Sequence, residues 1–276
     1  MLAVNNLSVS FSSYSFGLRR QTVQAVTDLS IEIEAGKILA VVGQSGGGKS
    51  LLVHALLDIL PKNAKVSGDI YFKGELLTKR RLQGLRGRKI ALIPQSMMYL
   101  DPLLQVGRQL TRAARLNGYN KGSARQMMLD ALRQYHLPEE AARCYPFQLS
   151  GGMARRILVA TATIGKADLL LADEPTNGLD GEMAAEAMQH LRHLADAGRA
   201  VLLISHDIEA ALKVADDVVI IRNGHTIEIA SASAFHRPDG LQHPYTRSLW
   251  QSLPVNDFLA VNAKSSADNM LKENYA

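Results

Sequence analysis

A glycine-rich segment near residue 45 is the part of the sequence best suited to bind phosphate. It fits the pattern GxxxxGK[ST] and reads Gly43-Gln44-Ser45-Gly46-Gly47-Gly48-Lys49-Ser50. Glycines let successive backbone N–H groups turn inward around an anion, and the N-terminus of a following helix adds positive potential. In this pattern Lys49 contacts the β- and γ-phosphates and the Ser50 hydroxyl ligates Mg²⁺. The segment therefore predicts nucleotide binding and allows phosphoryl transfer, without specifying the family.

Two neighbouring carboxylates follow an apolar run later in the chain. Asp173 and Glu174 come directly after Leu169-Leu170-Leu171-Ala172. An acid at the carboxyl end of a parallel strand faces the ligand crevice. Asp173 is placed to hold Mg²⁺ through water, and Glu174 to orient an attacking water or accept its proton. Acids are also common at solvated strand ends, so the functional interpretation depends on the phosphate loop being present as well.

Short apolar runs predict the strands that position these groups. Runs at 38–42, 90–93, 169–172, 200–204 and 218–221 are continuous in the way typical of strands buried on both faces. Helical stretches alternate with several of them, including 50–60 before Pro61, which favours a parallel α/β sheet. Leu7, Val9 and Phe11 alternate with serines, and the apolar side chains of residues 29–33 alternate with polar ones. These two segments predict a small antiparallel sheet at the N-terminus, and we expect the polar residues 12–24 between them to form a hairpin-like excursion.

The middle and the end of the chain have different patterns. Residues 99–147 carry apolar side chains at helical spacing and lack a long strand-like run, which predicts a helical insertion. We therefore expect a main domain over 1–240 with a helical subdomain inserted at about 97–165. Residues 241–276, which contain prolines and end in a polar stretch, are expected to form a C-terminal extension.

Composition narrows the classes of protein further. The chain has 276 residues, 47% hydrophobic residues, a formal charge of +5 and one cysteine, Cys144. A single cysteine excludes a disulfide framework or a multi-cysteine metal or iron–sulfur site within this chain. No apolar run reaches the roughly 18 residues of a membrane span, and no secretory signal is visible, so we expect a soluble protein of a reducing compartment. The charge is mild for a nucleic-acid binder, and no nucleic-acid partner is expected.

Further motifs resemble those of ABC ATPases. Leu149-Ser150-Gly151-Gly152-Met153 resembles the LSGGQ signature of that family, with Met153 in the last place. Gln95 resembles the Q-loop glutamine, Gly178-Leu179-Asp180 the D-loop and His206 the H-loop histidine. The resemblance covers about residues 1–250, and the motifs occur in the family order.

The resemblance implies a fold and a mechanism. The fold is a P-loop NTPase of the ABC ATPase type, α/β, with a mostly parallel core sheet, an N-terminal antiparallel β subdomain and an inserted α-helical subdomain. Two such subunits meet head to tail around two ATP molecules. Ser150 would cap a helix that opens with Gly151-Gly152 and meets the partner's γ-phosphate, and Asp180 would lie at the same nucleotide interface.

The resemblance also assigns roles at the chain's own nucleotide. Glu174, His206 and Lys49 would be catalytic, with His206 hydrogen-bonding the γ-phosphate. Gln95 would complete the Mg²⁺ shell with Ser50 and Asp173. An N-terminal aromatic would stack on adenine; Phe11 is the first choice and Tyr14 and Phe16 are alternatives, while Phe11 could equally be a sheet-core residue.

A narrower resemblance concerns the importer subfamily. The run from Tyr145 to Met153 resembles YPxxLSGGM, and His243-Pro244-Tyr245-Thr246-Arg247 matches the HPYTR element of oligopeptide, dipeptide and nickel importer ATPases. Residues 85–91 favour nickel or opine-metallophore members. Membership of this subfamily implies a second homologous ATPase as partner, with a heterodimer preferred over a homodimer. It also implies two transmembrane permeases and an extracytoplasmic solute-binding protein. The ATPase would then lie on the cytoplasmic face of the membrane as a peripheral protein.

Two other functions compete with the importer hypothesis. One is a soluble ABC ATPase that acts on nucleic acid or ribosomes, which usually has tandem ATPase domains or long coiled coils. The other is a P-loop kinase for a small molecule, which leaves the LSGGM segment and His206 unexplained. Met97 and Met98 could contact a membrane subunit or lie in the core. The basic cluster between 79 and 89 could be a solvated face or could approach anionic lipid headgroups.

Overall fold

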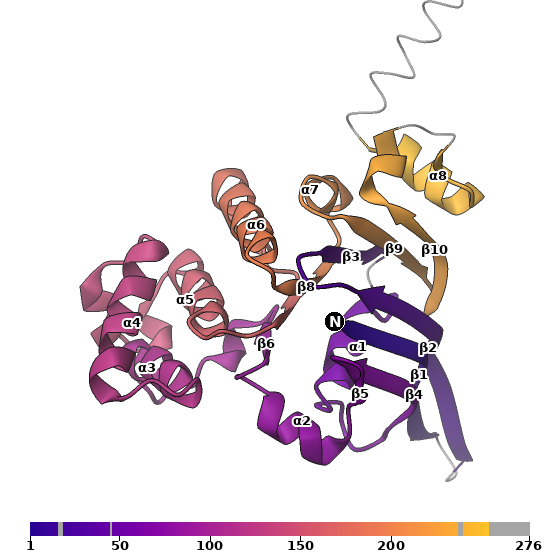
Figure 1. Ribbon diagram of the computed structural model, residues 1–276. Coiled ribbons are helices and arrows are strands. Elements are labelled where there is room, and N and C mark those ends of the chain that lie inside the picture. Colours follow the sequence, from indigo (N-terminus) through magenta and orange to yellow (C-terminus); the bar gives the residue numbers. More distant parts are fainter. Residues whose placement is uncertain (16–18, 45, 237–239, 254–276) are drawn as a thin grey trace, which may run out of the picture.

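The computed structural model describes residues 1–15, 19–44, 46–236 and 240–253, so Ser45, Phe16 and residues 254–276 lie outside it. Ten strands in this part of the chain form one sheet in the order β5-β4-β1-β2-β10-β9-β3-β8-β7-β6 (Figure 1). One half of the sheet is parallel and the other mainly antiparallel. The predicted α/β fold with a mostly parallel core is confirmed.

The parallel half contains all five predicted buried runs. Its strands are β3 (Ile38–Gly43), β6 (Ile90–Ile93), β7 (Leu169–Asp173), β8 (Ala200–Ser205) and β9 (Asp217–Arg222). Strand β3 lies between β8 and β9 and is parallel to both. Carboxyl ends of parallel strands meet at one edge, so the residues that follow β3, β6, β7 and β8 are brought to the same side.

Side chains of β3 alternate between two hydrophobic clusters, one on each face of the sheet. Leu39 and Val41 join the first cluster with Leu52 of α1 (Lys49–Leu56). Ala40 and Val42 join the second, which includes residues of α6 (Gly181–Asp196) and α7 (Ile208–Leu212). Because both faces are covered, the strand carries a continuous apolar run rather than an alternating one.

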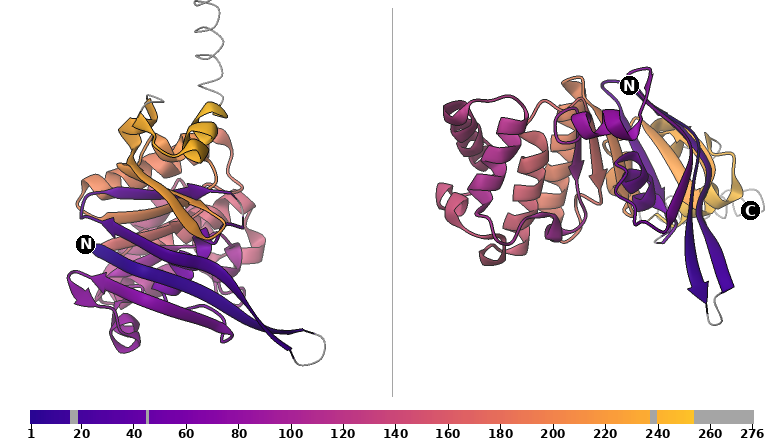
Figure 2. Two further views of the ribbon diagram at one scale, coloured as in Figure 1. Left: turned by 90° about the vertical axis from the view of Figure 1, so that its right-hand side faces the viewer. Right: turned by 90° about the horizontal axis from the view of Figure 1, so that it is seen from below.

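The antiparallel half is built around a long hairpin. Its strands are β1 (Leu2–Ser15), β2 (Arg19–Ile33), β4 (Ala64–Phe72) and β5 (Glu75–Leu76), with β10 (His225–Ser231) joining the two halves. The polar excursion expected at 12–24 consists of the paired ends of β1 and β2, with Ser12 opposite Thr22. This arm extends beyond the rest of the sheet in Figure 2.

Helix α1 is shorter than predicted. It ends at Leu56 rather than at residue 60, because Asp58 takes a left-handed conformation with φ of 48°. Helix α2 covers Lys79–Leu85, and the 3₁₀ helices are η1 (Met97–Tyr99), η2 (Glu139–Arg143), η3 (Pro146–Gln148) and η4 (Ala232–His236). None of the helices in the described ranges is both long and apolar enough to cross a membrane.

Three helices form a separate group beside the β6 edge of the sheet (Figure 1). They are α3 (Val106–Leu116), α4 (Lys121–Gln134) and α5 (Gly151–Thr163), and they share a third hydrophobic cluster. Leu110, Leu132 and Ile157, one from each helix, are fully buried in it. The helical spacing in this region therefore reflects a core of its own.

The start of the expected C-terminal extension packs against the main body. Helix α8 (Pro244–Gln251) places Trp250 in the second cluster, where Leu241 is fully buried. The indole N–H of Trp250 donates to the backbone oxygen of Phe235. A boundary at residue 241 thus falls inside this cluster, and the described part of the segment, up to Leu253, shares the core of the sheet.

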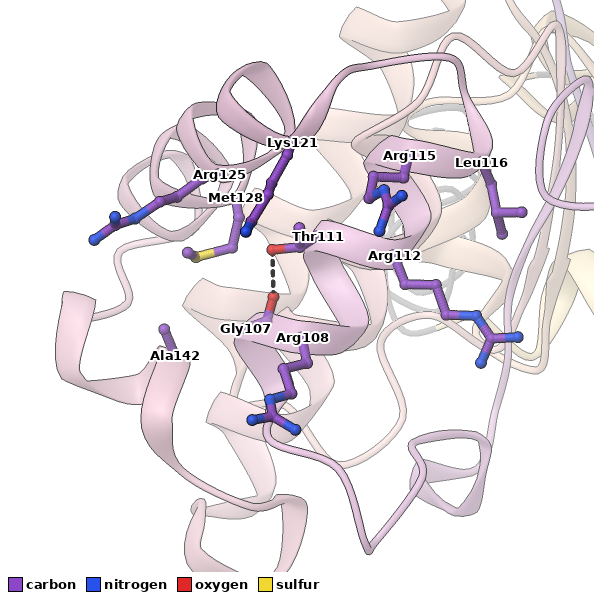
Figure 3. Close-up of a pocket in the computed structure, with 10 residues that line it drawn as sticks. All are labelled: Gly107, Arg108, Thr111, Arg112, Arg115, Leu116, Lys121, Arg125, Met128 and Ala142. Carbon is purple, nitrogen blue, oxygen red and sulfur yellow. Dashed lines mark hydrogen bonds between the residues drawn. The ribbon is translucent and has the colours of Figure 1, made fainter.

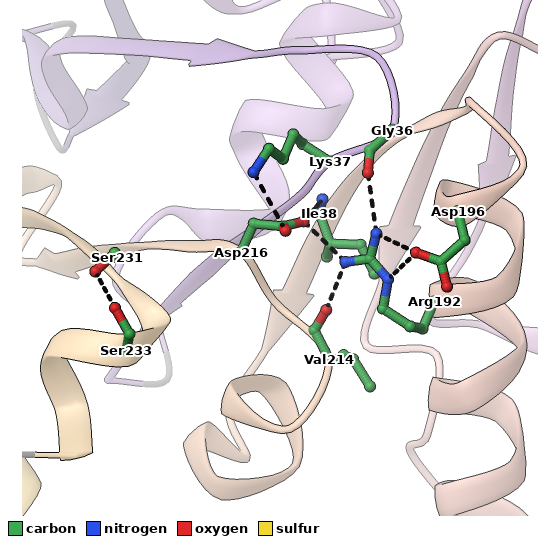
Figure 4. A network of polar contacts seen from close by, with 9 residues as sticks. All are labelled: Gly36, Lys37, Ile38, Arg192, Asp196, Val214, Asp216, Ser231 and Ser233. Carbon is green, nitrogen blue, oxygen red and sulfur yellow. Dashed lines mark hydrogen bonds and ion pairs between the residues drawn. The ribbon is translucent and has the colours of Figure 1, made fainter.

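A polar network fixes the beginning of β3 (Figure 4). Arg192 of α6 donates to Asp216, Asp196 and the backbone oxygens of Gly36 and Val214 over 2.8–3.1 Å. Asp216 also accepts from the backbone N–H of Ile38 at 2.8 Å. Burial alone would raise the pKa of Asp216, but these hydrogen bonds and the Arg192 charge bring it below the ordinary value.

We predict that Asp216→Asn lowers the free energy of unfolding by about 1.5–3 kcal/mol at neutral pH, the range for hydrogen bonds to charged groups. A carboxyl with a lowered pKa stabilises the fold above its unfolded pKa of about 3.9, and the contribution is lost as pH falls through the folded value. The gap between wild type and variant, measured by urea unfolding, should therefore close in acid.

Asp130→Asn is the matched control, because its carboxylate is 53% exposed and pairs only with Arg133 among the ion pairs of the described residues. It should change stability by less than about 0.5 kcal/mol. Equal effects of the two substitutions would contradict a structural role for the Asp216 network.

Candidate functional site

The phosphate loop joins β3 to α1 as the sequence predicts. Gly43 has φ of 147°, and a Cβ there would lie 2.0 Å from the backbone oxygen of Ile221. Gly48 has φ of 91°, and a Cβ there would lie 2.6 Å from the backbone oxygen of Ala25. Only glycine fits these two positions. Lys49, at the start of α1, is buried and donates to the backbone oxygens of Gly43 and Gln44 at 2.9 and 3.0 Å.

The lysine ammonium is therefore held on the inner side of the loop. Burial lowers the pKa of Lys49, while the carboxylates of Glu174 and Asp173 act in the opposite direction. Gly46 has φ of 78°, and the backbone N–H of Gly47 donates to the oxygen of Gln44 at 3.1 Å, which tightens the turn. Ser45 lies outside the described residues.

Ser50 and Asp173 are brought into direct contact. The Ser50 hydroxyl donates to Asp173 Oδ1 at 2.9 Å, although the two residues are 123 positions apart. Burial raises the pKa of Asp173, and the hydrogen bond from Ser50 partly offsets that effect. The hydroxyl of Ser50 on α1 and the carboxylate of Asp173 at the end of β7 are thus in contact, and their binding of Mg²⁺ stays a prediction.

Glu174 lies at the meeting point of three strand ends. Gln95, which follows β6, donates from Nε2 to Glu174 Oε2 at 2.6 Å. Nδ1 of His206, which follows β8, lies 3.5 Å from Glu174 Oε1. The Glu174 side chain is 15% exposed and its backbone N–H donates to the oxygen of Ile204. Gln95, expected in the Mg²⁺ shell, and His206, expected at the γ-phosphate, therefore both lie next to the carboxylate expected to activate water.

Arg155 is a residue of this site that sequence reasoning missed. It lies on α5, is 3% exposed, and its guanidinium donates to the backbone oxygens of Pro94, Gln95, Glu174 and Pro175. Burial lowers the pKa of Arg155, whereas Asp173 and Glu174 raise it. It therefore connects α5 to the backbone on either side of the Gln95–Glu174 contact. The sequence Arg155-Arg156 alone is typical of an exposed basic pair.

The signature residues lie on the helical group, away from α1 (Figure 1). The predicted capping is confirmed: Ser150 is the N-cap of α5, and its hydroxyl accepts from the N–H of Met153 at 3.3 Å. Gly151 and Gly152 form the first turn, and a Cβ on Gly151 would meet open space. Within one chain these residues are not brought to the phosphate loop.

Comparisons with known proteins identify the family. A model of the ABC transporter family matches residues 26–177. The chain belongs to the ABC transporter family. It carries the ATPase domain of that family, which confirms the predicted nucleotide-hydrolysing fold.

Named relatives of this ABC ATPase are similar along most of its length. Dipeptide transport ATP-binding protein DppD of Bacillus subtilis is 38% identical over 268 residues, which are 93% of this chain and 78% of DppD. The uncharacterized ABC transporter ATP-binding protein YejF of Escherichia coli is 39% identical over 269 residues, but the match spans only 49% of that longer protein.

A solved structure supports the fold. The dimeric, post-hydrolysis form of the ATP-binding cassette MJ0796, bound to ADP and Pi, superimposes with a TM-score of 0.73. The two share 24% sequence identity, and the alignment covers 84% of this chain and 99% of that one. At this identity the likeness concerns the fold alone.

Two more of the predicted site residues, Asp180 and Phe11, have contacts within the chain. Asp180 is the N-cap of α6, where Oδ1 accepts from the N–H of Met183 at 2.9 Å. Phe11 is partly buried against the first hydrophobic cluster and lies opposite Val23 and Ala64 in the sheet. Its stacking on adenine stays a prediction; the side chain of Tyr14 and all of Phe16 lie outside the described residues.

The methionines after Gln95 are exposed, so of the two alternatives left open by the sequence, a place in the core is wrong. Met97 and Met98 are 49% and 89% exposed, and nearby Phe147 is 74% exposed. In the basic cluster of 79–89, by contrast, four of the six cations pair with acids: Lys79 and Arg86 with Asp58, Arg81 with Glu75, and Lys89 with Asp168. Three carboxylates thus pair with four of the six cations, and the cluster keeps a net positive charge.

Arg155→Lys should reduce ATP turnover about 10- to 100-fold. A lysine ammonium cannot hydrogen-bond all four backbone oxygens that the guanidinium holds, so the loops that carry Gln95 and Glu174 would shift. Small displacements of catalytic groups have effects of this size. ATP affinity should stay close to that of wild type, since Arg155 does not line the phosphate loop. The measurement is kcat and KM for ATP with the folded fraction determined by circular dichroism.

Arg156→Lys is the control at the adjacent position. Arg156 donates to the backbone oxygens of Tyr135 and His136, which lie outside the site, and its substitution should leave turnover unchanged. If Arg155→Lys lowers the folded fraction but leaves kcat per folded molecule unchanged, Arg155 stabilises the domain and does not position the catalytic groups.

Proposed function

We propose that this ABC ATPase is the ATP-hydrolysing subunit of an importer of small peptides. The observation that carries the hydrolytic part is the position of Glu174, contacted by Gln95 and His206 beside the Ser50–Asp173 pair. The names of DppD from Bacillus subtilis and of DppD from Escherichia coli, 38% and 34% identical, support peptides as cargo. Nickel or a metal chelate is the alternative cargo from the sequence motifs.

ATP would bind with its phosphates in the loop from Gly43 to Ser50. Lys49 is already inside this loop, and its charge would be neutralised by the β- and γ-phosphates better than by two backbone oxygens. The inward-turned N–H groups and the N-terminus of α1 would complete the anion site. Phe11 is the proposed platform for adenine.

Mg²⁺ fits the oxygen donors next to the loop. Ser50, Asp173 and Gln95 would hold it, and it would neutralise charge on the phosphates. No cluster of three or more His, Cys, Asp or Glu side chains suited to a metal occurs among the described residues. Such a sparse protein donor set suits Mg²⁺, which keeps several waters and binds largely through substrate phosphates.

Glu174 would act as the general base for the attacking water. Its carboxylate accepts from Gln95 on one oxygen, and His206 lies near the other, so its orientation is fixed from two sides. His206 is 56% exposed and can turn toward a γ-phosphate without unpacking the core. The residues on β6, β7 and β8 would thus align water, base and phosphate for in-line attack.

The second half of each site would come from another subunit. Ser150, Gly151 and Gly152 present the N-terminus of α5, which suits a γ-phosphate but lies away from the chain's own loop. MJ0796, which shares the fold, is a dimer in its solved structure, and this supports the pairing of two ATPases. We propose a second homologous ATPase as the partner, with Asp180 at the interface. A heterodimer is preferred, and a homodimer is the alternative.

Glu174→Gln should lower ATP turnover at least about 100-fold, the lower bound for loss of a general base. Because ATP binding does not need the base, the variant should accumulate an ATP-bound dimer with its ATPase partner, detectable by size-exclusion chromatography with light scattering. Lys49→Ala is the contrasting variant and should lose nucleotide affinity about tenfold or more, with no trapped dimer. Hydrolysis by Glu174→Gln at the wild-type rate would exclude Glu174 as the base.

The transport path would lie in separate membrane subunits. Met97, Met98 and Phe147 line an open apolar groove together with Leu149, next to Gln95 and the start of α5. Methionine adapts well to irregular partner surfaces. We propose that a permease segment docks here on the cytoplasmic face, that two permeases and an extracytoplasmic solute-binding protein complete the system, and that nucleic acid has no part in it.

Met98→Glu should abolish uptake of a labelled dipeptide in cells that depend on this system, because a charge is buried without a partner in the docked state. The basal ATPase rate of the isolated chain should be unchanged, since Met98 is 89% exposed and has no place in the hydrolytic site. Leu103→Glu, at another exposed apolar side chain, is the control. Normal dipeptide uptake by Met98→Glu would exclude this docking surface.

A further inference from the structure

A basic hollow lies between α3 and α4, on the helical group and away from the phosphate loop. Five cations line it: Arg108, Arg112, Arg115, Lys121 and Arg125. Its volume is about 720 Å³, within the range of small-molecule sites. Figure 3 shows Lys121 reaching from α4 toward Thr111 on α3 across this space.

Helical periodicity collects these cations on two facing surfaces. Arg108, Arg112 and Arg115 are separated by four and three residues, so they share one face of α3. Lys121 and Arg125 are four residues apart and share a face of α4. The five charges are therefore concentrated by the fold rather than by the sequence, in which they are spread over eighteen positions.

None of the five cations has an ion-pair partner within the described part of the chain. The basic cluster of 79–89 differs, because four of its six cations have an acidic partner. All five side chains are exposed, so water and salt screen part of their mutual repulsion, and an anion bound between the helices would offset the remainder.

The position of two of the cations works against the helices themselves. Arg108 and Lys121 lie in the first turns of α3 and α4, where neither helix has an acidic residue. The positive end of a helix dipole disfavours cations there, by a few tenths of a kcal/mol or more at each site. Such local conflicts, without a structural gain, occur typically at functional sites.

The remaining wall of the hollow is apolar. Met128 is 8% exposed, Leu116 is 49% exposed, and Ala142 completes this side. The phosphates of a ligand can meet the arginines whether or not it has an organic part, and an organic ligand can in addition pack against this apolar wall. Arginine's planar fork suits phosphate oxygens in particular.

We propose that the basic hollow binds two or more phosphate groups, carried by one organic molecule or by neighbouring lipid headgroups. Two sources offer that chemistry, a soluble nucleoside polyphosphate and the headgroups of anionic phospholipids. The ligand would bridge α3 and α4. The site is separate from the proposed ATP site, because none of its lining residues comes from β3, α1 or β7.

The test uses the full chain carrying Lys49→Ala. This substitution weakens phosphate binding at the loop from Gly43 to Ser50, which would otherwise compete with the hollow for the probe. Binding of inorganic tripolyphosphate is measured by calorimetry, and binding to vesicles of equal parts phosphatidylcholine and phosphatidylglycerol by co-sedimentation. Arg112→Glu with Arg115→Glu should weaken the observed binding about tenfold or more, because attraction is replaced by repulsion. Lys121→Glu with Arg125→Glu, on the other helix, should have the same effect.

Arg80→Glu with Arg88→Glu is the matched control, since both side chains are exposed and none of the ion pairs of the described residues includes them. It has the same charge change and should leave binding intact. Loss for the two hollow variants but not the control, with unchanged circular dichroism, supports the site. Binding of tripolyphosphate alone identifies a soluble ligand, and binding to vesicles alone identifies lipid.

Three results would overturn the proposal: no binding of either probe by the parent chain, equal weakening by the control, or no weakening by either hollow variant. None of them bears on the proposed ATPase function. That function is measured separately through Glu174 and does not involve α3 or α4.

Discussion

The parallel pairing of β3 with β8, and of β8 with β7, is the constraint on which the site depends. Its register sets Val42 opposite Ser205 and Asp173 opposite Ile204, so three strands end at nearly the same level. The phosphate loop, the two carboxylates and His206 each begin where one of these strands stops. Their contacts follow from the ladder, and no direct link between the loops is needed to explain them.

Buried carbonyls at this edge create the need for Arg155. Loops leaving adjacent strands expose backbone oxygens that cannot join the ladder, and a buried unpaired carbonyl is costly. One guanidinium satisfies four of them, from Pro94, Gln95, Glu174 and Pro175. Because Arg155 belongs to the helix that Ser150 caps, the signature end of α5 and Glu174, the proposed base, are parts of one hydrogen-bonded unit.

Local patterns made much of the fold predictable. The loop from Gly43 to Ser50 and the apolar runs of β3, β7 and β8 depend on neighbouring residues, and each was recognised with nearly correct bounds. That Gln95, Glu174 and His206 belong to one site was predictable only because the motifs resemble a family; their direct contacts were not predicted. The chain's own spacing does not determine which strand ends lie side by side.

Features that depend on distant partners could not be predicted. Arg155 and Arg156 are adjacent and identical in type, and only tertiary packing buries one among four carbonyls. Trp250 follows a proline-rich stretch, yet long-range contacts with the second cluster hold it. The end of α1 was predicted at Pro61, but Asp58 ends it earlier by adopting a left-handed backbone conformation, which a periodicity argument cannot detect.

The joint between the two halves of the sheet has a mechanical consequence. Strands β2 and β10 share a single register pair, Thr27 with His225, and apolar packing in the first cluster also joins the two halves. The backbone N–H of Thr27 donates to the oxygen of Gly224 at 2.8 Å beside this pair. The oxygen of Ala25, in the same strand, would lie 2.6 Å from a Cβ at Gly48 and 2.5 Å from a Cβ at Gly224. The backbone next to the joint is thus packed directly against the phosphate loop, so a shift of β2 at Ala25 would displace Gly48 as well.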